Sequence, residues 1–95
     1  MEKNKILIIE RDDNVAIALS ELTSGSILYL DNKENSKLVV KSPIPVGHKI
    51  AIFDIKKGCN VIKYGEVIGA ATKDIEKGEL VDSENLESIR GKWKK

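Results

Sequence analysis

The sequence predicts a small, mainly β domain made of short strands that meet at tight corners. Its apolar residues fall in runs of strand length, and Gly and Pro separate those runs. No stretch of about ten residues shows the apolar stripe of an amphipathic helix. A chain of 95 residues is short enough to form one domain with one small core.

The first four strands are expected before the prolines. Lys5–Ile9 is an apolar run of strand length, and Asn14–Leu19 alternates large with small apolar side chains, which is the period of a strand. Ser26–Leu30 and Lys37–Lys41 flank the polar stretch Asp31–Ser36, and this arrangement predicts a hairpin.

The second half of the chain begins at Pro43 and Pro45, which hold their neighbours in extended conformations. The tail after Leu86 is polar and is expected to be a turn of helix or disordered. We therefore expect a domain over residues 1–86 and a linker-like tail over residues 87–95. The further strands that the pattern predicts are Lys49–Phe53, Val61–Lys63, Glu66–Ala71 and Glu79–Val81.

One phrase occurs three times, as Ala-x-x-[Asp/Glu]-[Ile/Leu]-x-x-Gly-x-x-[Leu/Val]. The copies are Ala18–Leu28, Ala51–Val61 and Ala71–Val81. We expect the acid to begin a single tight helical turn by accepting backbone N–H groups, and the Gly to close that turn with positive φ. The copies are offset by 33 and 20 residues, so a stacked solenoid is excluded. Three copies of one local role indicate a structural task for the acids Glu21, Asp54 and Asp74.

Composition excludes several classes of protein. Lys and Arg number 16 against 15 Asp and Glu, and this balance argues against a nucleic-acid binder. The single Cys59 excludes an internal disulfide and a cysteine-built zinc site, and its setting is that of a semi-exposed thiol. No apolar run approaches the length of a membrane span, and Met1–Lys5 lacks a signal-peptide pattern. We expect a cytoplasmic protein.

The motifs Gly47–Ala51, Asp54–Gly58, Val61–Gly69 and Ala71–Gly78 follow one another in an order that resembles the SAF domain of the altronate and galactarate dehydratases. Asp13–Leu19 resembles the opening strand of that family. The resemblance implies a β-clip fold and the loss of water from a sugar acid, with a divalent metal (iron or manganese) in the complex.

The resemblance also implies a partner. The family's SAF domain is either the N-terminal part of a dehydratase or a separate small subunit, and the small subunit of sulfolactate sulfo-lyase is a close relative. We therefore expect this chain to dock on a large catalytic subunit and to form one wall of the active site. The isolated chain should have no hydro-lyase activity. The alternatives are a non-catalytic SAF module that binds a carbohydrate or a protein, and a sulfo-lyase subunit.

This sequence departs from the family pattern at one place. Where the family reads Val-His-x-His-Asn-[Leu/Val], the chain reads Val81-Asp82-Ser83-Glu84-Asn85-Leu86. Both histidines are therefore replaced by acids. A carboxylate ligates hard metals or acts as a base, but with a resting pKa that differs from that of imidazole.

The candidate site residues come from the matched positions. His48, in Gly-His-Lys, is a candidate catalytic residue and metal ligand, and Glu84 has the same two candidate roles. Asp82 is a candidate metal ligand, because in an extended segment it would project to the same side as Glu84. Lys49 and Asn85 are candidates for binding substrate. Each has a plainer alternative: a surface or packing histidine, a solvated acidic face, a solvated lysine and a turn asparagine.

Two further features have structural explanations. Gly65–Gly69 lacks the setting of a phosphate loop and is interpreted as a turn or a close backbone approach. Lys92–Lys95 is a basic tip that contains the single Trp93, and it is either a frayed end or an interface anchor.

Overall fold

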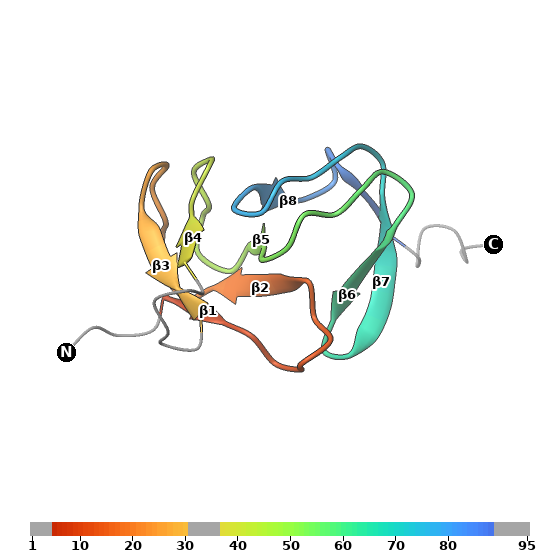
Figure 1. The fold of residues 1–95 in the computed structure, drawn as a ribbon, viewed down its shortest axis with the longest axis horizontal. Coiled ribbons are helices and arrows are strands. Elements are labelled where there is room, and N and C mark those ends of the chain that lie inside the picture. The colour runs from red at the N-terminus through yellow and green to blue at the C-terminus, as the bar shows by residue number, and fades with distance from the viewer. Residues whose placement is uncertain (1–4, 31–36, 89–95) are drawn as a thin grey trace.

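The computed structural model describes residues 5–30 and 37–88, and in these ranges the chain forms nine short strands and no α-helix (Figure 1). The strands form three antiparallel sheets. The mainly β fold with tight corners that the sequence predicts is therefore confirmed. No helix in the described residues is long and apolar enough to cross a membrane.

The central sheet has the strand order β1-β2-β5-β8, from β1 (Ile6–Leu7), β2 (Val15–Ala18), β5 (Lys49–Ala51) and β8 (Leu80–Val81). Both of its faces are covered. Ala16, Ala18 and Ile50 lie in one apolar cluster with Leu22, Leu28, Leu38, Val40, Ile44 and Ile52. Val15, Ala51 and Val81 lie in a second cluster with Ile55, Val61, Ala71 and Ile75. Ala16 and Ala18, the small residues of the expected alternation, are thus as buried as Val15, because an apolar cluster packs against each face of the sheet.

Two smaller sheets flank this centre. β3 (Ile27–Tyr29) and β4 (Lys37–Val39) form the expected hairpin, whose connection lies outside the described residues. β6 (Asn60–Lys63) and β7 (Glu66–Ala71) form a second hairpin, to which β9 is added.

The strand β9 (Leu86–Ser88) corrects the expectation of a helical turn or disorder after Leu86. It pairs with β7, where Gly69 lies opposite Ser88. A Cβ at Gly69 would collide with the carbonyl oxygen of Glu87, so the glycine permits this strand to approach. The strand runs across the expected boundary at residue 86.

Each copy of the repeated phrase is a corner, and the structure reveals a fourth copy over residues 40–50, with Pro43 in place of the acid. In every corner the residue after the glycine donates its backbone N–H to the carbonyl three residues earlier, as Ser26 does to Thr23 at 3.1 Å. The four corner glycines have φ between 85° and 100°. Hydrogen bond and φ together are those of a type II β-turn. The expected helical turn is therefore wrong, although the expected positive φ is confirmed.

The four corners form two pairs. Leu22 and Ile44 exchange backbone hydrogen bonds of 2.9 and 3.0 Å, and Ile55 and Ile75 exchange bonds of 2.8 and 2.7 Å. All four apolar side chains are buried. In each pair, the backbone N–H of one corner's glycine donates to the carbonyl of the first residue of the other corner, as Gly58 does to Ala71. The first pair lies in the first apolar cluster and the second pair in the second.

The acids of the second pair of corners act across the pair. The backbone N–H of Lys77 donates to Oδ1 of Asp54 at 2.8 Å, and that of Lys57 donates to Oδ1 of Asp74 at 2.9 Å. The structural role expected for these two acids is thus confirmed, but each carboxylate serves the partner corner rather than its own. Among the described residues, the Glu21 side chain makes no such bond.

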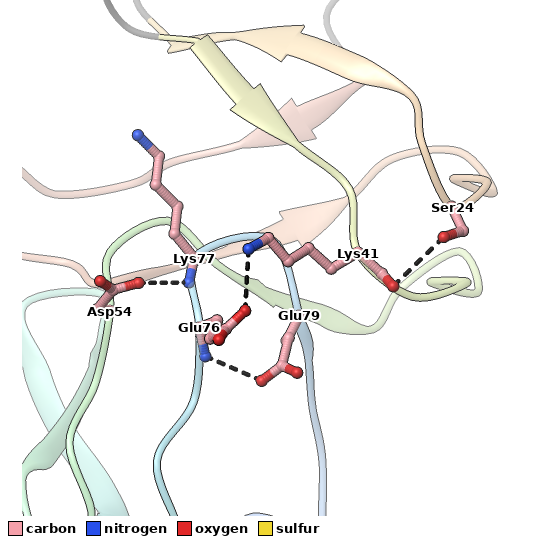
Figure 2. A network of polar contacts seen from close by, with 6 residues as sticks. All are labelled: Ser24, Lys41, Asp54, Glu76, Lys77 and Glu79. Carbon is pink, nitrogen blue, oxygen red and sulfur yellow. Dashed lines mark hydrogen bonds and ion pairs between the residues drawn. The ribbon is translucent and has the colours of Figure 1, made fainter.

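The two pairs of corners meet at Lys41 (Figure 2). Its Nζ lies 2.9 Å from Oε1 of Glu76, and its backbone N–H donates to the carbonyl of Gly78. The backbone there is so close that a Cβ at Gly78 would collide with the carbonyl oxygen of Val39. A side chain at Gly78 would therefore require the backbone to shift.

Candidate functional site

His48 lies immediately before β5, directly after Gly47 in the corner over residues 40–50. Its backbone carbonyl accepts a hydrogen bond from Ala18 at 2.9 Å, so its main chain is fixed in the central sheet. Its imidazole is exposed, and its nearest polar partner is the carbonyl of Val46, 3.4 Å from Nδ1. At that distance the contact is weak, and the ring is accessible to a ligand or a partner chain.

The segment that replaces the family's histidines is a turn over residues 82–85 and not an extended strand. Oδ1 of Asn85 accepts from the backbone N–H of Asp82 at 2.9 Å, and its Nδ2 donates to the carbonyl of Leu80 at 2.8 Å. The turn role that the sequence left open for Asn85 is thus present. Oδ1 of Asp82 accepts from the backbone N–H of Glu84 at 3.0 Å. The expectation that Asp82 and Glu84 project side by side from an extended segment is wrong.

Lys49 begins β5 and is half-buried. In the central sheet it pairs with Ile17 on one side and with Val81 on the other. Burial lowers the pKa of the Lys49 ammonium, the positive charge of Lys63 lowers it further, and the carboxylate of Asp82 acts in the opposite direction. The apolar neighbours Ile17 and Val81 and the charge of Lys63 therefore disfavour the charged form of Lys49.

The register of β5 and β8 brings three candidates to one place. Lys49 lies opposite Val81 in an antiparallel pair, so His48, which precedes Lys49, and Asp82, which follows Val81, are at the same end. Side chains alternate along a strand, so His48 and Lys49 project to opposite faces. Glu84 and Asn85 lie in the turn that follows.

The described residues do not by themselves fit a metal ion. No group of three or more His, Cys, Asp or Glu side chains in residues 5–30 and 37–88 is placed to hold one. His48, Asp82 and Glu84 therefore do not form a complete coordination shell in this chain, since structural and catalytic metal sites need at least three protein ligands in most cases.

Two residues that sequence reasoning did not single out organise the neighbourhood of Lys63. Asp13 is 1% exposed, and its carboxylate accepts from the backbone N–H groups of Gly65 at 2.8 Å and Glu10 at 3.1 Å. Asn14 accepts from the N–H of Ile62 at 2.7 Å and donates to the carbonyl of Asn60 at 2.9 Å. From the sequence, an Asp-Asn pair before a strand indicates only a turn. The partners of Asp13 and Asn14 in the β6–β7 hairpin are distant in the chain and are known only from the fold.

The pKa of Asp13 follows from these contacts. Burial acts to raise the pKa of its carboxyl, but the backbone N–H groups of Gly65, Glu10, Tyr64 and Ile9 outweigh burial, and the pKa is lowered. Asp13 therefore holds the turn between β6 and β7 as a carboxylate.

The turn between β6 and β7 has a strained residue. Tyr64 has φ of 59° and Gly65 has φ of 73°, which are the values of a type I′ hairpin turn. Tyrosine rarely adopts positive φ, and the conformation costs about 1 kcal/mol. Nζ of Lys63 lies 4.8 Å from the centroid of the Tyr64 ring.

The remaining sequence features have no place in this site. Cys59 is an exposed free thiol in the corner over residues 51–61. Gly65–Gly69 spans the hairpin turn and the close approach of β9, as the sequence indicated. The basic tip Lys92–Lys95, with Trp93, lies outside the described residues.

Comparisons with known proteins point to one family. Residues 4–89 match the altronate/galactarate dehydratase SAF domain. The chain is 44% identical over 73 residues to the altronate dehydratase of Escherichia coli (strain K12), an alignment that covers 77% of this chain and 14% of that protein. It is 33% identical over 88 residues to the (2R)-sulfolactate sulfo-lyase subunit alpha of Chromohalobacter salexigens, covering 88% of this chain and 94% of that subunit.

A further relative shows how much of each related protein the chain covers. The chain is 36% identical over 80 residues to the altronate dehydratase of Bacillus subtilis (strain 168), of which it covers 16%. It therefore spans about one seventh of the length of the two altronate dehydratases and nearly the whole of the sulfo-lyase subunit.

Proposed function

The chain belongs to the SAF-domain family of the altronate and galactarate dehydratases, and we propose that it acts as the small subunit of a two-part lyase that removes water from a sugar acid. The observation that carries this proposal is the similarity of the chain to a protein named subunit alpha, beside its similarity to the altronate dehydratases. The chain corresponds to a small part of the altronate dehydratases and to nearly all of a protein named subunit alpha. In this proposal a large subunit supplies most of the catalytic groups, and the isolated chain is inactive.

The residues at the common end of β5 and β8 are the proposed contribution of this chain. His48 has a fixed main chain and an accessible ring, which suit a catalytic group or a metal ligand. Lys49 would bind the carboxylate of the substrate. Asp82, Glu84 and Asn85 would line the same wall from the turn after β8, with Asp82 and Glu84 in the roles of the family's histidines.

A divalent metal, iron or manganese, belongs to this proposal only with ligands from the large subunit. His48, Asp82 and Glu84 are the residues of this chain that would complete its coordination. The metal would polarise the substrate and acidify the proton to be removed.

A sulfo-lyase is the second candidate, because the chain covers 94% and 98% of two sulfolactate sulfo-lyase alpha subunits. The two reactions share a chemical course. A proton leaves the carbon next to the carboxylate, and hydroxide or sulfite leaves the next carbon, so that a 2-keto acid results after tautomerisation. The leaving group is thus the point on which the candidates differ.

The first experiment is to tag the chain in its own host and to identify what co-purifies. We expect a large subunit of the dehydratase family in a fixed ratio, and 2-keto acid formation by the complex from a sugar acid. Release of sulfite from sulfolactate would assign the second candidate. Recovery of the chain alone, or with an unrelated protein, would favour a non-catalytic module that binds a carbohydrate or a protein.

Variants of the complex then test the site. His48→Ala and Asn85→Ala should each lower turnover, whereas Lys73→Ala, at an exposed position in the corner over residues 71–81, should not. Full activity of both site variants would show that this wall does not take part. Turnover by the purified chain alone would refute the two-part arrangement.

A further inference from the structure

The turn between β6 and β7 presents an exposed aromatic ring at the tip of a hairpin. Tyr64 is 51% exposed, and Gly65 follows it in the turn. A type I′ turn favours Asn followed by Gly, because both central residues have positive φ. Gly65 meets this requirement, whereas Tyr64 adopts its φ of 59° against the preference of its residue type. The chain therefore carries a tyrosine where asparagine would suit the backbone better.

The loop between β1 and β2 holds this turn in place. The buried carboxylate of Asp13 accepts from the N–H of Gly65 at 2.8 Å, and the side chain of Asn14 is bonded to β6 at 2.7 Å. Glu10 packs on Gly65, with its Cγ 3.3 Å from the place where a Cβ would lie. All of these contacts are made to backbone groups or to Gly65, so none of them requires a tyrosine at the tip.

The side chain of Tyr64 itself contributes little to the fold. Its hydroxyl forms no hydrogen bond within residues 5–30 and 37–88, and its ring belongs to neither apolar cluster. Nζ of Lys63 lies 4.8 Å from the centroid of the ring, which is a contact of small energy at an exposed position. A residue in a sparsely populated conformation is typical of a site where its side chain has a function. The ring is therefore placed for a contact outside this chain.

The surroundings of the ring are those of a protein interface. Val67 is 40% exposed and lies opposite Ile62 on the hairpin, which gives an apolar pair beside the tip. Lys63 and Glu66 form the next opposite pair and carry charges of both signs. An aromatic side chain with apolar neighbours and a charged rim is typical of a docking site for a protein. A nucleic acid would instead require an excess of positive charge.

Both ends of the family domain lead to this hairpin. The match to the family runs from residue 4 to residue 89, so it ends directly after β9, which pairs with β7. Near its other end, the loop after β1 packs Glu10 on the turn. The altronate dehydratase of Escherichia coli is covered over only 14% of its length, so the rest of that protein is joined to its SAF domain at one of these ends. The proposed large subunit corresponds to that remainder.

We propose that the tip of the β6–β7 hairpin docks on the large catalytic subunit and that the ring of Tyr64 enters an apolar pocket of that subunit. This rests on the proposed function and deepens it, because it names the surface through which the two subunits join. The strained turn holds the ring in its bound position before contact, so less conformational freedom is lost on association. Lys63 and Glu66 lie at the rim and face charges of opposite sign.

The stability of the isolated chain tests the strain. Tyr64→Asn gives the turn its preferred sequence, so we expect a higher urea midpoint than in the native chain. Tyr64→Phe keeps both the ring and the strain and should leave the midpoint unchanged. A lower midpoint in Tyr64→Asn would show that the ring stabilises the chain's own fold, and this would overturn the proposal.

Cross-linking in the host tests the contact. The tagged chain carries the photoreactive residue benzoylphenylalanine in place of Tyr64 or, as a control, of Tyr29. Tyr29 is 52% exposed but lies on β3, at the opposite end of the molecule (Figure 1). We expect position 64 to cross-link to a large subunit of the dehydratase family and position 29 not to do so. A cross-link from position 29 alone, equal cross-links from both positions, or none from position 64 would overturn the proposal.

Affinity gives the quantitative test, with the large subunit that co-purifies with the native chain as the titrant. Tyr64→Asn should weaken binding at least tenfold, the loss expected for an aromatic anchor. Tyr64→Phe should bind nearly as tightly as the native chain, and Tyr29→Asn should bind equally well. Loss of turnover in Tyr64→Phe with unchanged binding would assign the ring to catalysis and overturn the docking role.

Failure of this proposal is distinct from failure of the proposed function. If the native chain recovers no large subunit, the two-part lyase is wrong and the docking surface is wrong with it. If the native chain and Tyr64→Asn bind the large subunit equally, the two-part lyase stands and the docking surface alone is wrong.

Discussion

Asp13 shows how one buried carboxylate fixes a distant hairpin. It accepts backbone N–H bonds from Glu10 and from Gly65, which is 52 residues away in the chain. Asp13→Ala would remove the acceptor of two partly buried hydrogen bonds, and we expect a loss of about 2 kcal/mol in the free energy of unfolding. Asp13→Asn keeps one acceptor oxygen and should cost less. Urea denaturation of both variants at neutral pH measures these values, and equal stability of Asp13→Ala and the native chain would contradict the role.

The pH dependence of stability follows from the same contacts. The pKa of Asp13 is lower in the folded protein than its ordinary value of 3.8. The stability that Asp13 contributes is therefore fully present above the unfolded pKa and is lost as the pH falls through the folded pKa. We expect the native chain to lose more stability between neutral pH and pH of about 2 than Asp13→Asn loses. Parallel acid profiles for the two proteins would show that the carboxylate charge has no part.

Gly78 and Gly58 test which property of a corner glycine matters. Their φ angles are 100° and 88°, but a Cβ would meet the Val39 carbonyl at Gly78 and open space at Gly58. Gly58→Ala should therefore cost only the positive-φ penalty of about 1–2 kcal/mol. Gly78→Ala adds a backbone collision, and we expect a cost of roughly 3 kcal/mol or more. Chemical denaturation of the pair measures the difference, and equal costs would mean that the collision is relieved by a small shift.

At the scale of elements, the second pair of corners is held by reciprocal carboxylates. Asp54 binds the N–H of Lys77 and Asp74 binds the N–H of Lys57 at nearly equal distances. We expect Asp54→Ala and Asp74→Ala to cost about 1 kcal/mol each, as for the loss of a cap. Glu21→Ala, at the same place in the first copy, removes no such bond among the described residues and should cost little. A thermal or urea series on the three variants checks this, and an equal loss in Glu21→Ala would contradict it.

The sequence was sufficient for elements that depend on local patterns. The eight expected strands are present because each is an apolar run bounded by Gly, Pro or polar residues. The corner over residues 40–50 was missed because Pro43 stands where the acid was required, although Gly47 and Ile44 keep the spacing. β9 was missed because two of its three residues, Glu87 and Ser88, are polar, and because its pairing depends on Gly69, which lies 17 residues before Leu86 and permits the approach.

The candidate site depended more strongly on non-local structure. The sequence pointed to His48, Lys49 and Asp82, but their common end is set by the register of β5 and β8. Lys63 and Asp13 had no local signal for the site, because the contact of Asp13 with Gly65 and the effect of Lys63 on Lys49 arise only from tertiary packing. Residues 82–85 form a turn and not the expected extended segment, because the Asn85 side chain forms hydrogen bonds with the backbone of Asp82 and Leu80.

At the scale of the whole molecule, two apolar clusters share one sheet. β2 gives Ala16 to the first cluster and Val15 to the second, and β5 gives Ile50 to the first and Ala51 to the second. Neither cluster can open without exposing one face of the sheet that supports the other. The clusters should therefore unfold in a single cooperative transition, as small domains generally do.

A matched pair of substitutions tests this cooperativity. Ile44→Val in the first cluster and Ile75→Val in the second each remove one buried methylene group and should each cost about 1 kcal/mol. If the sheet couples the clusters, either variant will accelerate hydrogen exchange equally at hydrogen-bonded amides of both, such as Ile52, bonded to Asn14, and Ile55, bonded to Ile75. Faster exchange of Ile55 alone in Ile75→Val would show that the second cluster opens by itself. The end of the sheet that carries Lys49 would then belong to a less stable half of the molecule.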